Sequence, residues 1–249
     1  MTALVRSELL KVRTIRSWWA YLIVIVAFTG LAVAAQIGST DGGDRGTVDF
    51  QSDLVETAGI ALLLAIILGI TIMTTEFRFG TVTPTFLVAP ARELVIAAKA
   101  IAAAVLAIGF ALLALLVVAV VALPWLASVG AETHLLDGEI GTGAAQQILS
   151  VVLWALMGVA IGAVVQSQVA ALVGTLVWIF LGETLLIGLF GLLDIDGAAA
   201  YLPFQALDAA DGSGGGELLS YWPGVAVSLG WIALLGAVGV ARTRRRDIT

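Results

Sequence analysis

The chain has 249 residues, of which 60% are hydrophobic and only 12% are charged, and its mean hydropathy is +1.07. Soluble domains are about 45–50% apolar and about 25% charged, so this composition excludes a soluble globular protein and predicts a membrane protein. The absence of cysteine excludes disulfides and thiol catalysis, and the one histidine, His134, cannot form a metal cluster by itself. The formal net charge is −6, but the positions of the charges along the chain are more informative than their sum.

The first segment, residues 2–17, has the pattern of an amphipathic helix. Its apolar residues recur at helical spacing on one face, while its basic residues lie largely off that face. A basic amphipathic helix beside a span is typical of a segment in the membrane interface; a plain cytoplasmic extension of the first span is the alternative. Glu8 and Lys11 are spaced as an i,i+3 pair, which predicts local stabilisation of this helix. The apolar face consists of Leu4, Val5, Leu9, Val12 and Ile15.

Six apolar stretches are long enough to cross a bilayer as helices, which takes about 20 residues each. Their apolarity is continuous, whereas the strands of a membrane barrel would alternate between apolar and polar residues. The third stretch is longer than required, so we expect it to tilt or to extend into the cytoplasm. The sequence therefore predicts an all-α integral membrane protein with a single transmembrane domain over residues 1–249. The spans are expected at about 18–37, 58–75, 100–126, 148–165, 169–193 and 224–241.

The first span has one feature of a cleavable signal peptide, because Ala32-Val33-Ala34 fits the small-residue pattern of a cleavage site. The apolar stretch has about 20 residues, however, whereas the apolar core of a signal peptide has about 7–15. We therefore expect the first span to remain in the protein.

The basic residues indicate how the chain is oriented. With the N-terminus in the cytoplasm, eleven of the twelve Lys and Arg residues fall on the cytoplasmic side, and only Arg45 falls outside. Positive residues collect on the cytoplasmic side of short loops, so both termini are expected there. The basic tail from Arg242 is then a topology signal; binding of nucleic acid or anionic lipid is the alternative. The cytoplasmic set is Arg6, Lys11, Arg13, Arg16, Arg78, Arg92, Lys99, Arg242, Arg244, Arg245 and Arg246.

The longest cytoplasmic connection, Thr74–Val95, joins the second and third spans. It carries too many aromatic and aliphatic residues for a solvated linker. Gly80 suits a sharp turn, and Pro90 ends any helix that precedes it. Apolar residues exposed beside charges predict a docking surface; a short helix packed on the protein itself is the alternative. The apolar residues are Phe77, Phe79, Phe86, Leu87 and Val88.

Glu183, in FLGETLLIG, is an ionisable residue near the centre of the fifth span. An acid at that depth costs about 2.5 kcal/mol or more, which favours a polar point on a substrate path; a protonated or hydrogen-bonded packing residue is an equal alternative.

Gly158 and Gly162 form a G-x-x-x-G pattern, which predicts close helix packing within the subunit. The outer segment Asp194–Pro223 begins apolar, so part of it is expected to dip back into the membrane.

Motifs for chemistry on this chain are missing from the sequence. A Walker A motif needs a lysine after a glycine, and both lysines, Lys11 and Lys99, follow other residues. This excludes a self-contained P-loop ATPase. The sequence also lacks the G-x-S-x-G, H-E-x-x-H and EF-hand patterns, so we predict neither a catalytic residue nor a metal or cofactor site.

These features together resemble the permease subunits of type-2 ATP-binding-cassette exporters, the ABCG-like group, in their small bacterial six-span form. The loop looks like that family's E-x-R-x-G-T…P-x-R…K pattern. The Gly-rich fourth span with QSQVAALVG, Glu183 in the fifth span and YLPFQAL after it are also similar, and the resemblance covers most of the chain. Pro84 departs from the pattern, because it would delay or bend the helix expected there. The matching loop residues are Glu76, Arg78, Gly80, Thr81, Pro90, Arg92 and Lys99.

The resemblance implies a permease dimer, of identical or different copies, in the bacterial plasma membrane. Two separate ATPase subunits would carry ATP and Mg²⁺, so this chain would have neither cofactor nor catalytic residues, and no nucleic-acid partner. A cytoplasmic coupling helix between the second and third spans would dock on the ATPase. Glu183 is a candidate residue of the substrate pathway, and hydrophobic drugs, lipids or peptides are candidate substrates. The expected coupling residues are Glu76, Phe77, Arg78, Gly80, Thr81, Phe86, Leu87, Pro90 and Arg92.

Two other functions stay open on the sequence. An ion-coupled transporter could work without ATP and use Glu183 as its coupling carboxylate. An integral membrane enzyme is less favoured, because the sequence offers no polar cluster for acid–base work at the interface.

Overall fold

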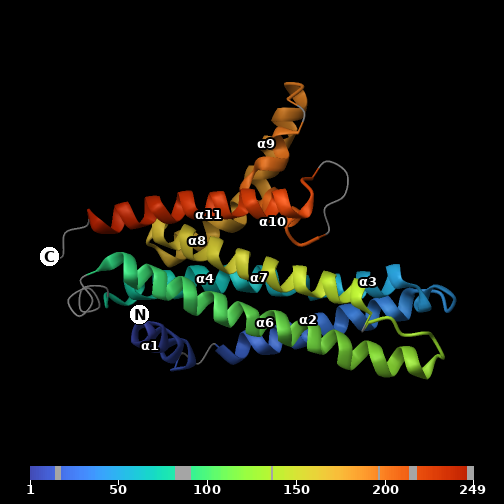
Figure 1. The fold of residues 1–249 in the computed structure, drawn as a ribbon. Helices are drawn as coiled ribbons and strands as arrows, with labels where there is room; N and C mark the ends of the chain where they lie inside the picture. Colours follow the sequence, from blue (N-terminus) through green and yellow to red (C-terminus); the bar gives the residue numbers. More distant parts are fainter. Residues whose placement is uncertain (15–17, 82–90, 136, 196, 213–217, 246–249) are drawn as a thin grey trace.

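The chain folds into a bundle of long apolar helices (Figure 1). The computed structural model describes residues 1–14, 18–81, 91–135, 137–195, 197–212 and 218–245, and these ranges contain helices and connecting turns without a strand. The helices are α1 (Thr2–Thr14), α2 (Trp18–Ser39), η1 (Asp44–Gly46), α3 (Val48–Glu56), η2 (Thr57–Gly59), α4 (Ile60–Phe79), α6 (Arg92–Ser128), α7 (Gly138–Val165), α8 (Gln168–Val177), η3 (Trp178–Gly182), α9 (Glu183–Leu192), η4 (Ala198–Tyr201), α10 (Pro203–Ala209) and α11 (Tyr221–Arg244).

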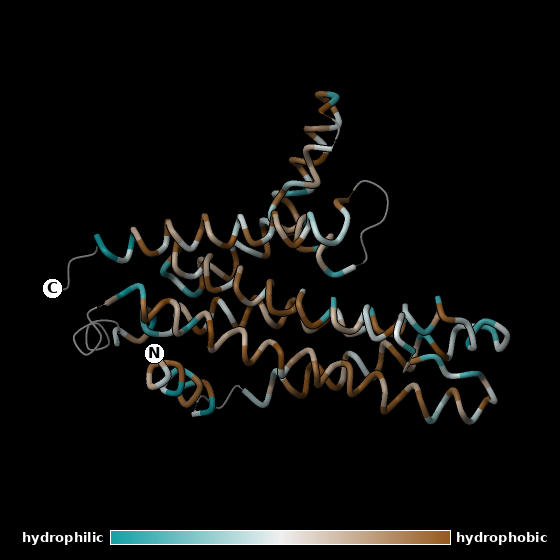
Figure 2. Tube along the Cα trace, in the orientation of Figure 1, coloured by the Kyte–Doolittle hydropathy of each residue, from teal (hydrophilic) through white to brown (hydrophobic). Residues whose placement is uncertain are grey.

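Six helical segments of the described residues are long and apolar enough to cross a membrane, which confirms the predicted six-span, all-α architecture. Figure 2 shows the apolar residues along the length of the bundle and the polar ones toward its two ends. The third segment has 37 residues and begins well before the predicted boundary, as its excess length suggested. The segments are Trp18–Ser39, Val48–Phe79, Arg92–Ser128, Ile140–Val165, Gln168–Leu192 and Tyr221–Arg244.

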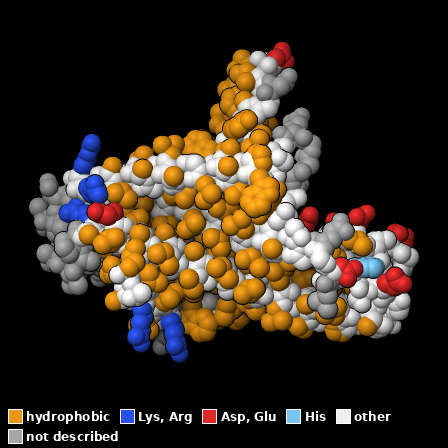
Figure 3. All heavy atoms as spheres, in the orientation of Figure 1, with side chains coloured by type: hydrophobic (Ala, Val, Ile, Leu, Met, Phe, Trp, Pro, Cys, Tyr) orange, Lys and Arg blue, Asp and Glu red, His pale blue; other side chains and the backbone are white. Residues whose placement is uncertain are grey.

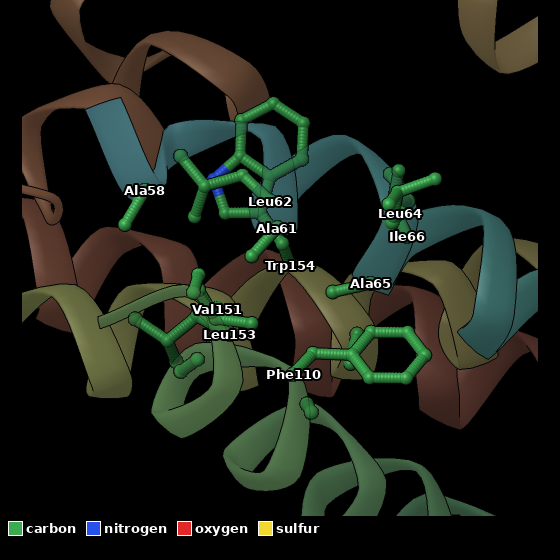
Figure 4. Close-up of a cluster of buried hydrophobic side chains, with 14 of the residues drawn as sticks. Ala58, Ala61, Leu62, Leu64, Ala65, Ile66, Phe110, Val151, Leu153 and Trp154 are labelled. Atoms are coloured by element: carbon green, nitrogen blue, oxygen red, sulfur yellow. The ribbon is translucent and has the colours of Figure 1, made fainter. Parts of the chain in front are cut away.

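The core lies where α4 packs against α7, with α6 completing the contact. Glycines allow this approach: a Cβ added to Gly69 would lie 2.1 Å from the carbonyl oxygen of Ala155, and one added to Gly158 would lie 2.3 Å from that of Ile66. Gly162 faces α4 in the same way, so the predicted packing role of the G-x-x-x-G pattern within the subunit is confirmed. Figure 4 shows the buried side chains of this region, among them Ala58, Ala61, Leu62, Leu64, Ala65, Ile66, Phe110, Val151, Leu153 and Trp154.

The fifth span is interrupted, which the sequence analysis did not predict. A π-helical turn, η3, separates α8 from α9, and α9 (orange in Figure 1) points away from the bundle. Leu185 is 71% exposed and Leu192 is 84% exposed, so α9 presents apolar side chains on its surface. A π turn inserts a residue into the helical repeat, and it commonly marks a bend or a functional site.

The segment between the fifth and sixth spans folds back along α11. The indole nitrogen of Trp231 donates a hydrogen bond of 2.9 Å to the carbonyl oxygen of Tyr201. Trp231 lies ten residues into α11, or about 15 Å from its start at 1.5 Å per residue. α10 then returns along α11, with Phe204 and Leu207 buried. η4 and α10 therefore lie beside the first half of α11, and their entry into the membrane stays a prediction.

Charge separates toward opposite ends of the bundle (Figure 3). One end, here called the basic end, holds α1, the last turn of α4, the first turns of α6 and the C-terminus of α11. The opposite, acidic end holds η1, α3 and the α6–α7 connection. α1 lies roughly across the direction of the spans at the basic end (Figure 1), the orientation expected of a helix in a membrane interface.

Candidate functional site

Four charged side chains from three helices meet at the basic end. Glu8 and Lys11 come from α1, Glu76 comes from the last turns of α4, and Lys99 comes from the second turn of α6. Lys11 Nζ lies 2.6 Å from a carboxylate oxygen of both Glu8 and Glu76. Lys99 Nζ lies 2.8 Å from Glu8 and 3.3 Å from Glu76. Each ammonium group therefore contacts both carboxylates, and we call these four residues the ionic quartet.

The ionic quartet is largely removed from solvent. Glu8 and Glu76 are each 5% exposed and Lys99 is 2% exposed, whereas the side chain of Lys11 is 44% exposed. Burial lowers the pKa of Lys11, but its hydrogen bonds to the two carboxylates outweigh burial and raise that pKa above its usual range. Removing one partner of a buried ion pair costs about 3–5 kcal/mol, since the other charge stays buried without compensation. The quartet therefore fixes α1 against α4 and α6.

Sequence reasoning found only part of this cluster. The local i,i+3 pair of Glu8 with Lys11 is confirmed, but the pair also belongs to a larger cluster, because Lys99 joins it from 91 residues away. The sequence pattern places Glu76 and Lys99 in the loop motif and gives no sign that they contact α1. A usable signal was present: Lys99 sits in the apolar stretch LVIAAKAIAAA, where a lysine needs a buried counter-ion.

A second set of contacts joins the start of α6 to the end of α11. The guanidinium of Arg92 donates to the carbonyl oxygens of Thr243 and Arg244, in the last turn of α11. Arg244 in turn pairs with Glu93 at 3.2 Å. The last carbonyls of a helix lack partners within it, and cations there also oppose the negative end of the helix dipole. Arg92 therefore caps α11 while it starts α6.

The loop between α4 and α6 begins with the turn that its sequence predicted. Gly80 has φ +68°, a left-handed conformation suited to glycine, and it ends α4. The backbone N–H groups of Gly80 and Thr81 both donate to the carbonyl oxygen of Glu76. Arg78 is exposed; it donates to the side-chain oxygen of Gln168 at 3.2 Å and lies over the Phe79 ring.

The remaining predicted coupling residues divide into two groups. Phe77 is partly buried and packs against the core. The other group lies outside the described residues: Phe86, Leu87 and Pro90, and also Pro84, the residue that departs from the family pattern. The described structure therefore brings together the two ends of the loop. Glu76 holds one end through the quartet, and Arg92 with Lys99 holds the other. An element fixed at both ends passes a displacement on to the helices that hold it.

Glu183 lies far from this cluster and has a different environment. It is 2% exposed and directly follows the π turn of the fifth span. Its carboxylate accepts hydrogen bonds from the backbone N–H groups of Phe204 at 2.8 Å and Gln205 at 3.2 Å, and from the Trp178 indole at 3.4 Å. These N–H groups open α10 and have no acceptor within it. Glu183 thus caps the N-terminus of α10 from another helix, an arrangement that sequence spacing could not show.

The comparison with protein families agrees with the geometry. The model of the ABC-2 family transporter proteins matches residues 4–182 of the chain, from α1 to the end of η3. The chain belongs to the ABC-2 transporter family. As an ABC-2 protein it is the membrane subunit of an ABC transporter, a class whose members generally partner with ATPase subunits and are not themselves catalytic. No similar protein was found among the curated ones. The ABC-2 match includes all four quartet residues and ends directly before Glu183.

Proposed function

We propose that this ABC-2 protein is the permease of an exporter, and that the loop between α4 and α6 receives the motion of a separate ATPase. The observation that carries the proposal is the attachment of both ends of that loop, at Glu76 before it and at Arg92 and Lys99 after it, with Glu76 and Lys99 both in the ionic quartet. ATP and Mg²⁺ would bind to the ATPase, and two permease copies would complete the transporter in the bacterial plasma membrane.

The attachment suggests how coupling works. A force applied to the loop is transmitted directly to α4 and α6, and through the quartet to α1. Through Arg92 it also acts on the end of α11. A change between inward-open and outward-open states requires contacts that differ between them, and rigid movement of a helix set supplies such a difference. The basic end would face the cytoplasm, where the ATPase is.

Glu183 supports a second candidate function less strongly. A buried carboxylate in a span is the group that an ion-coupled carrier would use. Its three hydrogen bonds to Trp178, Phe204 and Gln205 give it a structural use that requires no transported ion. A pathway role for Glu183 is thus the second candidate and not the first. The proposed substrates of the transporter are hydrophobic drugs, lipids or peptides.

The decisive experiment measures how much ATPase stays with the permease after detergent extraction, when both are expressed together. Phe86→Ala with Leu87→Ala should insert normally but retain less ATPase, because truncation of an apolar anchor typically costs more than about 1–2 kcal/mol. It should also lose stimulation of ATP hydrolysis by substrate. The matched control, Asp41→Ala with Asp44→Ala, changes exposed residues at the acidic end and should retain the partner. Equal retention by wild type and the loop variant would eliminate this loop as the coupling element.

The orientation of the protein in the membrane can be tested by labelling single introduced cysteines. The sequence has no native cysteine, so no background labelling of the protein is expected. Cysteines placed at the exposed Ser39 and Ser128 should react with an impermeant thiol reagent added outside intact cells, and one at the exposed Thr14 should not. Labelling of the Thr14 cysteine from outside would invert the proposed topology.

A further inference from the structure

A groove of about 680 Å³ lies between α1, α2 and α6 on the outside of the bundle. This volume falls in the range of ligand pockets, roughly 300–1,000 Å³. Its walls are almost entirely apolar, and Arg13 is the one charged side chain among the lining residues described. The residues that matter here are Leu9, Arg13, Trp18, Tyr21, Val105 and Gly109.

The groove runs from the basic end toward the middle of the bundle. Arg13 and Trp18 lie at the level of α1 and the first turn of α2, and the α6 wall extends to Leu113. Along α6 the wall runs from Val105 to Leu113, eight residues or about 12 Å. One leaflet is about half of the roughly 30 Å hydrocarbon core of a bilayer, so the groove fits within the depth of one leaflet.

The polar end of the groove has the features of a headgroup site. Arg13 is exposed, and its guanidinium can bind two phosphate oxygens at once. Trp18 is 42% exposed at the start of its span, where aromatic residues commonly mark the membrane–water interface. The groove shares Val12, Trp18, Tyr21 and Leu68 with a smaller cavity that ends on the ionic quartet. An occupant would therefore lie against the helix that the quartet holds in place.

We propose that this groove binds an anionic phospholipid of the leaflet at the basic end, with an acyl chain along α6 and the phosphate at Arg13. The apolar walls require a chain, which excludes a free phosphate as the ligand. The positive charge at the mouth favours a net negative headgroup over a zwitterionic one, whose own cation would be repelled. The proposal does not depend on coupling to an ATPase, so either can fail without the other.

Native mass spectrometry of the purified full-length protein tests the proposal. Phosphatidylglycerol and phosphatidylcholine with identical acyl chains are titrated separately. One basic residue near a membrane surface contributes about 1 kcal/mol toward anionic lipid, so phosphatidylglycerol should bind roughly fivefold more tightly. Arg13→Gln should reduce this preference to near parity. Arg6→Gln is the matched control, since Arg6 is exposed on the same helix but does not line the groove, and it should keep the preference.

Gly109→Trp tests the chain site separately. A Cβ at Gly109 would meet no atom within 4 Å, so a side chain can start there without a backbone clash. The indole would then occupy groove volume, and binding of both lipids should fall. Leu116→Trp, on the exposed surface of α6 outside the groove, should leave binding unchanged.

Three results would overturn the proposal: equal loss of preference in the Arg6 and Arg13 variants, unchanged lipid binding by Gly109→Trp, or equal competition by glycerol phosphate alone. If Gly109→Trp does not give a monodisperse protein, the comparison of the two arginine variants decides.

Discussion

Two buried carboxylates, Glu76 and Glu183, are stabilised in opposite ways. Glu76 meets two ammonium groups, from Lys11 and Lys99, that belong to other helices. Glu183 meets backbone N–H groups at the start of α10 and one indole. Both acids are at most 5% exposed, so burial alone does not distinguish them.

The difference concerns what each acid holds in place. The carboxylate of Glu76 belongs to a cluster that joins three long helices, so its loss should alter the relative positions of α1, α4 and α6. The carboxylate of Glu183 supports one short helix beside a span that is already bent. A buried acid in a membrane protein is commonly taken as part of a transport path. Here the partners of each acid indicate positioning for Glu76 and helix capping for Glu183.

The largest expected effect comes from Lys99→Met. It removes the more buried cation of the quartet and leaves Glu8 and Glu76 to share Lys11, so we expect a loss of about 3–5 kcal/mol in the free energy of unfolding. Thermal unfolding in detergent, followed by the loss of monodisperse protein, measures it. Lys11→Met should cost less, because the side chain of Lys11 is 44% exposed and its charge is better solvated.

A rescue separates charge from packing at the same site. Glu8→Gln combined with Lys99→Met removes one charge of each sign and should recover part of the lost stability. If Lys99→Met unfolds like wild type, the quartet does not hold α1 against the bundle.

Changes at Glu183 should have smaller effects. Glu183→Gln keeps one acceptor for the N-terminus of α10 and should cost about 1 kcal/mol, whereas Glu183→Leu leaves the N–H groups of Phe204 and Gln205 unpaired and should cost about 1–3 kcal/mol. Unfolding and transport are measured on the same preparations. The capping interpretation predicts that activity follows stability. A Glu183→Gln variant that folds like wild type but no longer transports cationic substrates would instead support a pathway role.

Asp208 on α10, outside the six spans, gives a pH-dependent test beside Glu183. Burial, and then the carboxylates of Asp211 and Glu183, raise the pKa of Asp208 from 3.8 to about 7. The folded state therefore binds this proton more tightly than the unfolded state, and stability falls as pH rises from about 4 to 7. Asp208→Asn should be more stable than wild type above pH 7 and equal to it near pH 4. Parallel unfolding curves at the two pH values measure this, and an unchanged difference between them would contradict it.

The smallest effect on stability is expected for Arg78→Ala. Arg78 is exposed, and its hydrogen bond to Gln168 is a surface contact, so the unfolding free energy should change by less than about 1 kcal/mol. Under the proposed function the same variant should still retain less ATPase. A fall in stability as large as that of Lys99→Met would place Arg78 with the quartet, and not with the docking surface.

The sequence predicted the architecture well because long apolar runs leave few alternatives in a bilayer. Gly80 and the pair of Gly158 with Gly162 were also predictable, since each acts through local backbone geometry or close packing. The partners of Glu8 and Glu183 were not, because periodicity shows which face of a helix is apolar but not which distant helix meets it. The π turn at Trp178–Gly182 could not be predicted for a related reason: a continuous apolar stretch has the same sequence pattern whether its helix is straight or bent.

The ionic quartet also constrains how the protein is made. Glu8 and Lys99 are 91 residues apart, so at about 5–20 residues per second the ribosome needs roughly 5–20 seconds to deliver the lysine after the glutamate. During that interval Glu8 can pair with Lys11, which is on the same helix. The N-terminal helix can pair with α4 through Lys11 and Glu76 once the second span has emerged, but the quartet is complete only after Lys99 of α6 follows. Full attachment of the N-terminus is thus a late step of biogenesis, although its residues are translated first.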